Sequence, residues 1–468
     1  MLTKLASRLR LGSFIFVAAV LAIAVLGAIG VRAFVRWVDQ PAKPTWTCGT
    51  SRMIPKTLHV KMRTALDASR MQALGGAWLA NVSPLFTTPS SDARGQWLRV
   101  ESYDATNALA AMQMDANVVD AFEVPETDLA RMPVVHDRVA HDDGESCPIT
   151  TPSFESYQGY LGPAPHGIDA PAAWRRGQRG GGVWFADVEG GWNDKHEDLP
   201  GERITHAGGT PIPDWTWRAH GTAVLGEVVG KDNGKGVVGI APDVERVFTS
   251  SIGGTSVANA IDVAARKLRP GDVLLIELQS SGPRGAWIPV EWWNDVFDAI
   301  KAATDRGVIV IEAAGNGYED LDHRAYGGRF DRAKRDSGAI MVGAGAPPRS
   351  GFADRERLDF SNYGARVDVQ GWGRKVATLD YGDLQDCSTT NEADRHYTGE
   401  FSGTSSASPI VAGAAVILEG VARSKGGFIT PRNLRELLRR TGTPQAGDTR
   451  QQIGPRPDLA RALRELDR

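Results

Sequence analysis

Four short segments of the sequence carry side chains that together suit nucleophilic catalysis. Ser405 lies in residues 403–409 (Gly-Thr-Ser-Ser-Ala-Ser-Pro), and His220 precedes a Gly-Thr pair. Asp187 directly follows an apolar run, and Asn316 lies in a glycine turn. These side chains can supply a nucleophile, a base, an orienting acid and an oxyanion donor. The set predicts acyl-transfer chemistry, although each residue alone also fits an ordinary cap, core or turn position.

The segment that follows Ser405 is small, apolar and almost free of charge. The stretch 403–409 therefore predicts a tight turn that delivers the serine to the N-terminus of a central helix. Unpaired backbone N–H groups and the positive end of the helix dipole lie at such a terminus. Both would stabilise an oxyanion that develops beside Ser405.

Apolar strands that alternate with helices predict the architecture that positions these residues. The runs 182–186, 272–276 and 308–311 are apolar apart from the leading Asp272, as expected for strands buried on both faces. The alternation predicts an α/β fold with a doubly wound, mostly parallel sheet and helices on both faces, over residues 155–466. Active sites in such sheets lie beyond the carboxyl ends of the strands, where Asp187 and Asn316 are expected.

A smaller unit is predicted at residues 55–126. Strands are expected at 57–62, 96–100 and 118–124, and helices at 65–74 and 106–115, which together make a small α+β domain. The polar residues 127–154 that follow predict an exposed linker of the kind that proteases cut.

Residues 11–33 predict a transmembrane anchor or signal helix. Their apolar run is long enough to span about 30 Å, and the basic residues within 1–10 precede it. An uncleaved anchor is favoured, and a cleaved signal stays open. With 34–54 as a linker, the rest of the chain is expected to be extracytoplasmic (periplasmic or extracellular), either membrane-anchored or secreted after processing.

Charge and cysteine content exclude some functions and leave others open. The net charge of −3 and the absence of a long basic run do not indicate a nucleic-acid partner. The three cysteines, Cys48, Cys147 and Cys387, lack the paired spacing of a zinc site. A disulfide between Cys147 and Cys387 and free or alternatively paired thiols remain equally open.

The motifs around these residues resemble those of the subtilisin-like serine peptidases, or subtilases. The likeness is carried by residues 403–409 and by the His-Gly-Thr at 220–222. Supporting matches are Gly-Ile-Ala-Pro at 239–242, Phe-Ser-Asn-Tyr-Gly at 360–364 and the segment 454–459. The resemblance covers about residues 155–466 and implies a subtilisin-like fold.

The resemblance also implies a role for each site residue. Ser405 would attack the scissile carbonyl, His220 would take its proton, and Asp187 would orient the histidine. The Asn316 amide and the Ser405 backbone N–H would form the oxyanion hole. Residues 55–126 would be a propeptide that acts as folding template and intramolecular inhibitor, with autocleavage between Val124 and about Phe154.

Two departures from the family pattern affect the expected site. The sequence Val-Glu-Gly follows Asp187 where Ser or Thr and then Gly is usual, and His196 with its following Glu-Asp-Leu arrives slightly late. Gln279, Ser280 and Ser281 align with the substrate-binding strand, where Ser-Leu-Gly is common. The residues expected to bind substrate are Gln279, Ser280, Ser281, Gly282, Ala313, Ala314 and Gly315.

The sequence thus predicts an exported serine endopeptidase, made as a zymogen, that acts on protein or peptide substrates. The alternative from another class is a catalytically silent subtilase-like module that binds extended peptides. Metal-dependent hydrolysis through His196 and His206 lacks an HExxH arrangement, and His196 is expected to be structural. No cofactor or metal is expected to take part in the chemistry, and structural calcium is left open.

Overall fold

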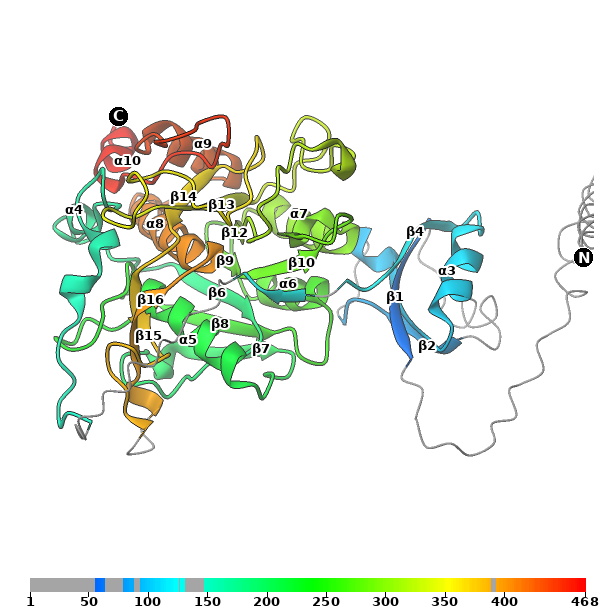
Figure 1. The fold of residues 1–468 in the computed structure, drawn as a ribbon, viewed down its shortest axis with the longest axis horizontal. Coiled ribbons are helices and arrows are strands. Elements are labelled where there is room, and N and C mark those ends of the chain that lie inside the picture. Colours follow the sequence, from blue (N-terminus) through cyan, green and yellow to red (C-terminus); the bar gives the residue numbers. More distant parts are fainter. Residues whose placement is uncertain (1–54, 64–78, 88–92, 126, 131–146, 389–392) are drawn as a thin grey trace, which may run out of the picture. The chain divides into compact units, whose positions relative to one another are not determined.

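The computed structural model describes residues 55–63, 79–87, 93–125, 127–130, 147–388 and 393–468 (Figure 1). The predicted anchor at 11–33, the linker at 34–54 and the predicted helix at 65–74 lie outside these residues. Within them, residues 55–125 form an N-terminal α+β unit, and residues 127–130 together with the residues from 147 onward form a larger α/β unit.

The described part of the N-terminal α+β unit is a four-stranded antiparallel sheet with one α-helix and a short 3-10 helix, Ala93–Gln96. The strand order is β2 (Leu79–Pro84), β3 (Trp97–Ser102), β1 (Lys56–Met62) and β4 (Val118–Glu123), and the helix is α3 (Ala105–Gln113). Alternate residues of β1 point into the core, where Leu58, Val60 and Met62 are fully buried. Strand β2 was not predicted, whereas β1, β3, α3 and β4 occur within a few residues of the predicted positions.

The larger unit contains a seven-stranded sheet in which every pair of neighbours is parallel. Its order is β14 (Val369–Trp372), β13 (Ile340–Gly345), β12 (Ile309–Ala313), β9 (Val273–Ile276), β6 (Trp184–Glu189), β8 (Arg246–Ser251) and β7 (Ile204–Gly208). The three predicted apolar runs become β6, β9 and β12. The predicted parallel sheet is thus confirmed for this unit.

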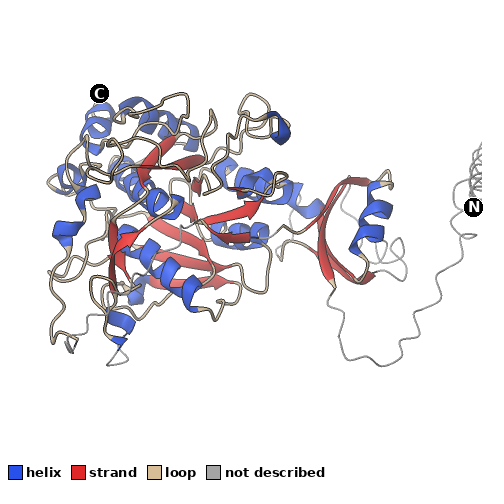
Figure 2. Ribbon diagram, in the orientation of Figure 1, coloured by secondary structure: helices blue, strands red, loops and turns tan. Residues whose placement is uncertain are grey.

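Helices cover both faces of this sheet (Figure 2). Helices α5 (Trp215–Val229) and α8 (Thr404–Ser424) pack on one face, and α6 (Val257–Ala265) and α7 (Asn294–Asp305) on the other. Strand β9 shows why the strands read as continuous apolar runs: Val273 and Leu275 join the core under α5 and α8, whereas Leu274 and Ile276 join the core under α6 and α7.

Smaller elements complete the larger unit. A three-stranded antiparallel sheet has the order β11 (Trp287–Pro289), β10 (Leu278–Ser281) and β5 (Thr127–Leu129). Strands β15 (Val376–Leu379) and β16 (Tyr397–Phe401) form a hairpin that leads into α8. The remaining α-helices of the described part are α4 (Ala170–Trp174), α9 (Pro431–Thr441) and α10 (Leu459–Leu466).

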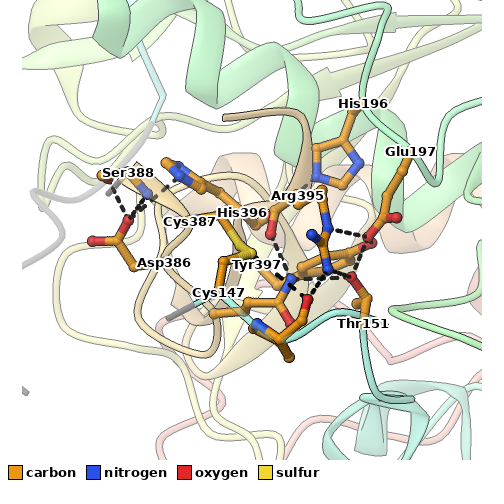
Figure 3. Close-up of a disulfide and its surroundings, with 12 residues drawn as sticks. Cys147, Thr151, His196, Glu197, Asp386, Cys387, Ser388, Arg395, His396 and Tyr397 are labelled. Atoms are coloured by element: carbon orange, nitrogen blue, oxygen red, sulfur yellow. Dashed lines mark hydrogen bonds and ion pairs between the residues drawn. A yellow bond between two sulfur atoms is a disulfide. The ribbon is translucent and has the colours of Figure 1, made fainter. Parts of the chain in front are cut away.

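One disulfide joins Cys147 to Cys387, across 240 residues of sequence (Figure 3). It ties the start of the larger unit to the loop between β15 and β16. Polar contacts gather beside it on Glu197, which accepts hydrogen bonds from Tyr397 (Oη to Oε1, 2.9 Å) and from the hydroxyl of Thr151. Of the two cysteine alternatives left open by the sequence, the structure contains the pair.

Within the described part of the chain, helix α8 is long and apolar enough to cross a membrane. However, 94% of its apolar stretch is buried inside the protein, where it contacts β9, β12, β13 and β14. The burial indicates a core helix, and it carries no information on residues 11–33.

Candidate active site

His220 is held inside helix α5, which Asp214 caps by accepting hydrogen bonds from first-turn backbone N–H groups. The histidine is fully buried, and its ring lies edge-on to that of Phe401, with centroids 5.3 Å apart. Gly221 permits a close approach of the helix to the loop after β6, because a Cβ there would lie 2.3 Å from the carbonyl oxygen of Gly191. The helix therefore brings His220 to the carboxyl end of β6.

The carboxylate beside His220 belongs to Glu189, which corrects the prediction that Asp187 orients the histidine. His220 Nδ1 lies 3.0 Å from Glu189 Oε1, and both side chains are fully buried. Asp187 Oδ2 instead accepts a hydrogen bond from Trp192 Nε1 at 2.7 Å. The physical reason is the length of β6, which runs on to Glu189, so that Asp187 lies inside the strand and Glu189 at its end.

Asp187 and Glu189 are two residues apart on one strand, so they project from the same face of the sheet. Burial raises the pKa of Asp187 well above its usual range, and the neighbouring charge of Glu189 raises it further. The hydrogen bond from Trp192 offsets only part of this rise. The environment therefore favours Asp187 as a neutral acid behind Glu189.

The sequence held one signal for this distinction, the late arrival of His196 and its following Glu-Asp-Leu. The interval from the acid to His196 is two residues shorter when it is counted from Glu189 than when it is counted from Asp187. His196 itself is buried against Tyr397, and its Nε2 lies 2.8 Å from the carbonyl oxygen of His396. Burial lowers the pKa of His196 to about 4, so it is neutral and packed in the interior near the disulfide.

Ser405 is the second residue of α8, and Gly403 precedes the helix with a φ of 114° that favours glycine. The helix begins at Thr404, so Pro409 lies inside it and not at its start. The backbone N–H groups of the first turn have no partner within the helix. That of Ser405 donates to the carbonyl oxygen of Ala130 at 2.8 Å.

Asn316 faces the same helix end from the turn after β12. Its Oδ1 accepts hydrogen bonds from the backbone N–H of Thr404 at 3.0 Å and from the Thr404 hydroxyl at 3.1 Å. These bonds fix the orientation of the amide. The Nδ2 group is buried and has no hydrogen-bond partner among the described residues. An unpaired buried donor is costly, so Nδ2 is available to an additional acceptor beside Ser405.

Residues 127–130 lie against β10 as an added antiparallel strand. Asp128 pairs with Gln279 and Thr127 with Ser280, and the N–H of Ala130 donates to the Glu277 carbonyl oxygen at 3.1 Å. Gln279 makes two further contacts: Nε2 donates to the Leu129 carbonyl oxygen at 2.7 Å, and Oε1 accepts from the Asn316 N–H at 2.9 Å. Such main-chain pairing is a common mode of extended-peptide binding.

The other residues predicted to bind substrate lie at different positions. Ser281 pairs with Trp287 of β11, and Gly282 forms a turn to Ala286. Ala313 and Ala314 bond to β13 at the end of β12, and the Gly315 N–H donates to the Thr404 hydroxyl at 3.2 Å. The structure thus places Gln279, Ser280 and Gly315 in the part of the site that contains the serine. The segment that pairs with residues 127–130 begins at Glu277, two residues before the predicted Gln279.

Glu277 is the site residue that the sequence analysis missed. It lies between β9 and β10, it is fully buried, and its Oε2 lies 3.0 Å from Ser408 Oγ on helix α8. Burial raises the pKa of Glu277 well above its usual range, and the Glu189 carboxylate adds to the rise, whereas the contact with the Ser408 hydroxyl lowers it. A glutamate after an apolar run was its only sequence signal.

Among the residues that the structure describes, no group of three or more His, Cys, Asp or Glu side chains has an arrangement that would hold a metal ion. His206, the second histidine of the metal hypothesis, contacts the Gly209 carbonyl oxygen (Nε2, 3.0 Å) and the Thr249 hydroxyl (Nδ1, 3.3 Å). His196 and His206 therefore have contacts within the fold.

The sequence of the chain matches a known protein family. The sequence model of the subtilase family matches residues 191–454, which is more than half of the chain. The chain belongs to the subtilase family. As a subtilase, it is a serine endopeptidase, and its substrates are proteins or peptides. The match begins two residues after Glu189, so it includes His220, Asn316 and Ser405 but not the acid.

Three related proteases show how far the sequence of this chain has diverged from other subtilases. The chain is 26% identical over 269 residues to the major intracellular serine protease of Bacillus subtilis (strain 168), covering 54% of this chain and 73% of the relative. It is 28% identical over 265 residues to subtilisin Savinase of Lederbergia lenta, covering 54% and 81%. With the alkaline protease of Alkalihalobacillus alcalophilus, it is also 28% identical over 265 residues, covering 54% and 58%.

A solved structure extends the likeness in fold. Fervidolysin from Fervidobacterium pennivorans, described as a keratinolytic enzyme related to subtilisin, superposes with a TM-score of 0.58 at 18% identity. The superposition covers 89% of this subtilase and 62% of fervidolysin. The chain thus spans less than two thirds of fervidolysin and of the alkaline protease.

Proposed function

We propose that this subtilase hydrolyses peptide bonds with Ser405 as nucleophile, His220 as base and Glu189 as the acid that orients the histidine. The hydrogen bond from the Ser405 N–H to the Ala130 carbonyl oxygen carries the proposal, because it holds a peptide carbonyl beside the serine. Ser405 Oγ would attack that carbonyl carbon while His220 takes the hydroxyl proton. His220 would then protonate the leaving amine, and water would hydrolyse the acyl enzyme.

Two donors would stabilise the tetrahedral oxyanion. The Ser405 N–H already contacts the Ala130 carbonyl oxygen, and Asn316 Nδ2 is a buried donor without a partner among the described residues. Thr404 fixes the amide through Asn316 Oδ1, so Nδ2 is turned away from those bonds. Preorganised donors of this kind cost no reorganisation during the reaction.

Replacing Asn316 by alanine is expected to lower kcat by about a hundredfold to a thousandfold with little change in KM, because the lost donor acts on the oxyanion and not on the ground state. Steady-state kinetics on a peptide substrate measure the effect. Asn294→Ala, in which a hydrogen bond to Asp120 is lost, is a control outside the site. Equal loss in both variants would contradict the assigned role.

We further infer that residues 55–126 are an inhibitory propeptide and that residues 127–130 are its carboxyl end, bound as a product or substrate is bound. The bond positioned for cleavage is then Ala130–Arg131. Contacts with α7 support an inhibitor role: His59 Nδ1 lies 2.6 Å from Asp295 Oδ2, and Lys61 Nζ lies 2.6 Å from Asp298 Oδ2. They join strand β1 to the larger unit.

The contacts of Gln279 suggest a preference for small residues before the scissile bond. Its side chain spans from the Leu129 carbonyl oxygen to the Asn316 N–H, and it is almost fully buried. It therefore fills space between β10 and the turn that holds Asn316. Ala130, which is itself fully buried, is consistent with a shallow pocket at this position.

The full chain tests the proposal through its own processing. Expression is expected to yield a mature fragment that begins at Arg131, identified by intact mass and N-terminal sequencing, and a fluorophosphonate is expected to label Ser405. Ala130→Trp is expected to slow processing strongly, because tryptophan does not fit beside Gln279. The matched control is Ala116→Trp, which changes an exposed alanine of the N-terminal unit.

Each result has a separate meaning. Label on Ser405 without cleavage at Arg131 would contradict the processing site and leave the serine chemistry standing. A folded chain that stays full length and unlabelled, even after a trace of another protease has removed residues 1–130, would favour the silent peptide-binding module.

Export is part of the proposal. Residues 11–33 would act as anchor or signal helix, with the remaining chain in the periplasm or outside the cell. The Cys147–Cys387 disulfide supports this placement, because disulfides persist mainly in oxidising compartments. No cofactor is proposed for the chemistry.

A further inference from the structure

Glu277 lies next to the peptide segment that is held against Ser405. Its carbonyl oxygen accepts the N–H of Ala130, and the carbonyl oxygen of Ala130 accepts the N–H of Ser405. The backbone of Glu277 therefore holds the residue whose peptide bond is to be cut. Its side chain lies on the face of the sheet that α5 and α8 cover, and its Oε2 lies 3.0 Å from the hydroxyl of Ser408, about one helical turn beyond Ser405 in α8.

The geometry at Ser408 indicates where a proton lies. Ser408 Oγ is 2.7 Å from the Thr404 carbonyl oxygen and 3.0 Å from Glu277 Oε2. A hydroxyl has one proton to donate, and a carbonyl oxygen can only accept. If Ser408 donates to Thr404 along the shorter contact, then Glu277 must be the donor in the longer one. A protonated Glu277 lets both contacts be hydrogen bonds at once, whereas with a carboxylate the single Ser408 proton can serve only one of them.

The surroundings of Glu277 also disfavour a charge there. Asp187 and Glu189 face it from β6, and Glu227 and His220 lie on α5. An ionised Glu277 would add a buried negative charge to a site that already contains the Glu189 carboxylate, which is unfavourable in a low-dielectric interior.

We propose that Glu277 is a positioning residue that works as a neutral carboxylic acid beside Ser405, and that its ionisation switches off the peptidase as the pH rises. The inference rests on the proposed role of Ser405 as nucleophile. Negative charge develops on the substrate carbonyl oxygen during attack, and a buried carboxylate one helical turn from Ser405 would oppose it. A neutral acid leaves that charge to the Ser405 N–H and Asn316.

The sign of the pH dependence follows from the direction of the pKa shift. Burial is the largest cause that raises the pKa of Glu277, and the Glu189 carboxylate adds to it, so the acid keeps its proton to a higher pH than an exposed glutamate. The competent form is the protonated one, so activity is present below that pKa and falls above it. For a single group the fall is about tenfold per pH unit.

The test compares the self-processed wild type with Glu277→Gln, which is neutral at every pH and keeps a donor toward Ser408. Values of kcat/KM for a peptide substrate and rates of fluorophosphonate labelling are measured against pH. The variant is expected to lose the alkaline decline that the wild type shows. Glu419→Gln is the matched control, since Glu419 is another buried glutamate whose pKa burial raises to about 8, at the far end of α8.

Three outcomes would overturn the inference, two of them in the pH profiles. If Glu277→Gln abolishes labelling at every pH, Glu277 is a required base; if the alkaline decline persists, Glu277 does not control it. Infrared difference spectra of wild type against Glu277→Gln provide a readout that does not need activity. A protonated-carboxyl band that is present at neutral pH in the wild type and missing in the variant supports the inference, and its absence from the wild type contradicts it. Failure of wild-type labelling alone is instead a failure of the proposed function.

Discussion

Replacing Glu189 by glutamine is expected to lower kcat by about ten-thousandfold, the loss typical when the acid of a serine-histidine triad loses its charge. Glu189 Oε1 lies 3.0 Å from His220 Nδ1 inside the protein, so its charge fixes the tautomer of the imidazole and stabilises the imidazolium that forms. Glutamine has nearly the same shape, so the fold is expected to persist. Steady-state kinetics of the self-processed variant, or of one processed in trans, measure the loss.

Asp187→Asn is the matched control, because it changes the acid that the sequence favoured. Asp187 accepts a hydrogen bond from Trp192 and is favoured as a neutral acid, so its amide analogue is expected to keep most of the activity. Reversed results, with Asp187→Asn inactive and Glu189→Gln active, would restore Asp187 as the acid of the triad. Circular dichroism separates loss of catalysis from loss of fold.

Replacing Ser405 by alanine is expected to lower kcat by about a millionfold, since loss of the nucleophile removes covalent catalysis altogether. The chain is also expected to remain uncut at Ala130–Arg131, because the bond held beside the serine would have no attacking group. The Ser405 N–H would still bind the Ala130 carbonyl oxygen. Intact mass over time and turnover of a peptide substrate check the two expectations.

Ser402→Ala is the control for this variant. Ser402 lies three residues earlier, outside the helix, and its hydroxyl donates to the Glu400 carbonyl oxygen at 2.7 Å. Normal processing in Ser402→Ala and none in Ser405→Ala would assign the chemistry to one serine. Processing that continues in purified Ser405→Ala would show that another group or another protease makes the cut.

Much of the larger unit follows from residue patterns. Runs of apolar residues at β6, β9 and β12 could be read only as strands buried on both faces, and the alternation with helices then required parallel pairing. His220, Asn316 and Ser405 were found because each lies in a short motif of small residues. Small residues are needed there because the backbone packs closely, as between Gly221 and Gly191. Such a requirement is visible in the sequence as a short motif.

The acids could not be found in the same way. An apolar run gives the start and type of a strand but not its last residue, so Asp187 and Glu189 could not be distinguished by the end of β6. The role of Glu277 depends on how residues 127–130 pair with β10, which joins segments about 150 residues apart. Such register is set by tertiary packing. Because side chains alternate between the two faces, a strand shifted by two residues presents the same face to the core, so the sequence pattern does not distinguish the two registers.

In the proposed precursor, the Cys147–Cys387 disulfide limits how the catalytic unit would be released. The chain has three cysteines, and this pair leaves Cys48 without an intrachain partner. Both paired cysteines lie on the carboxyl side of the Ala130–Arg131 bond, so once that bond is cut no covalent link joins residues 1–130 to the catalytic unit. Escape from an anchored fragment would then be governed by the dissociation rate of a noncovalent complex, and reducing conditions would not accelerate it.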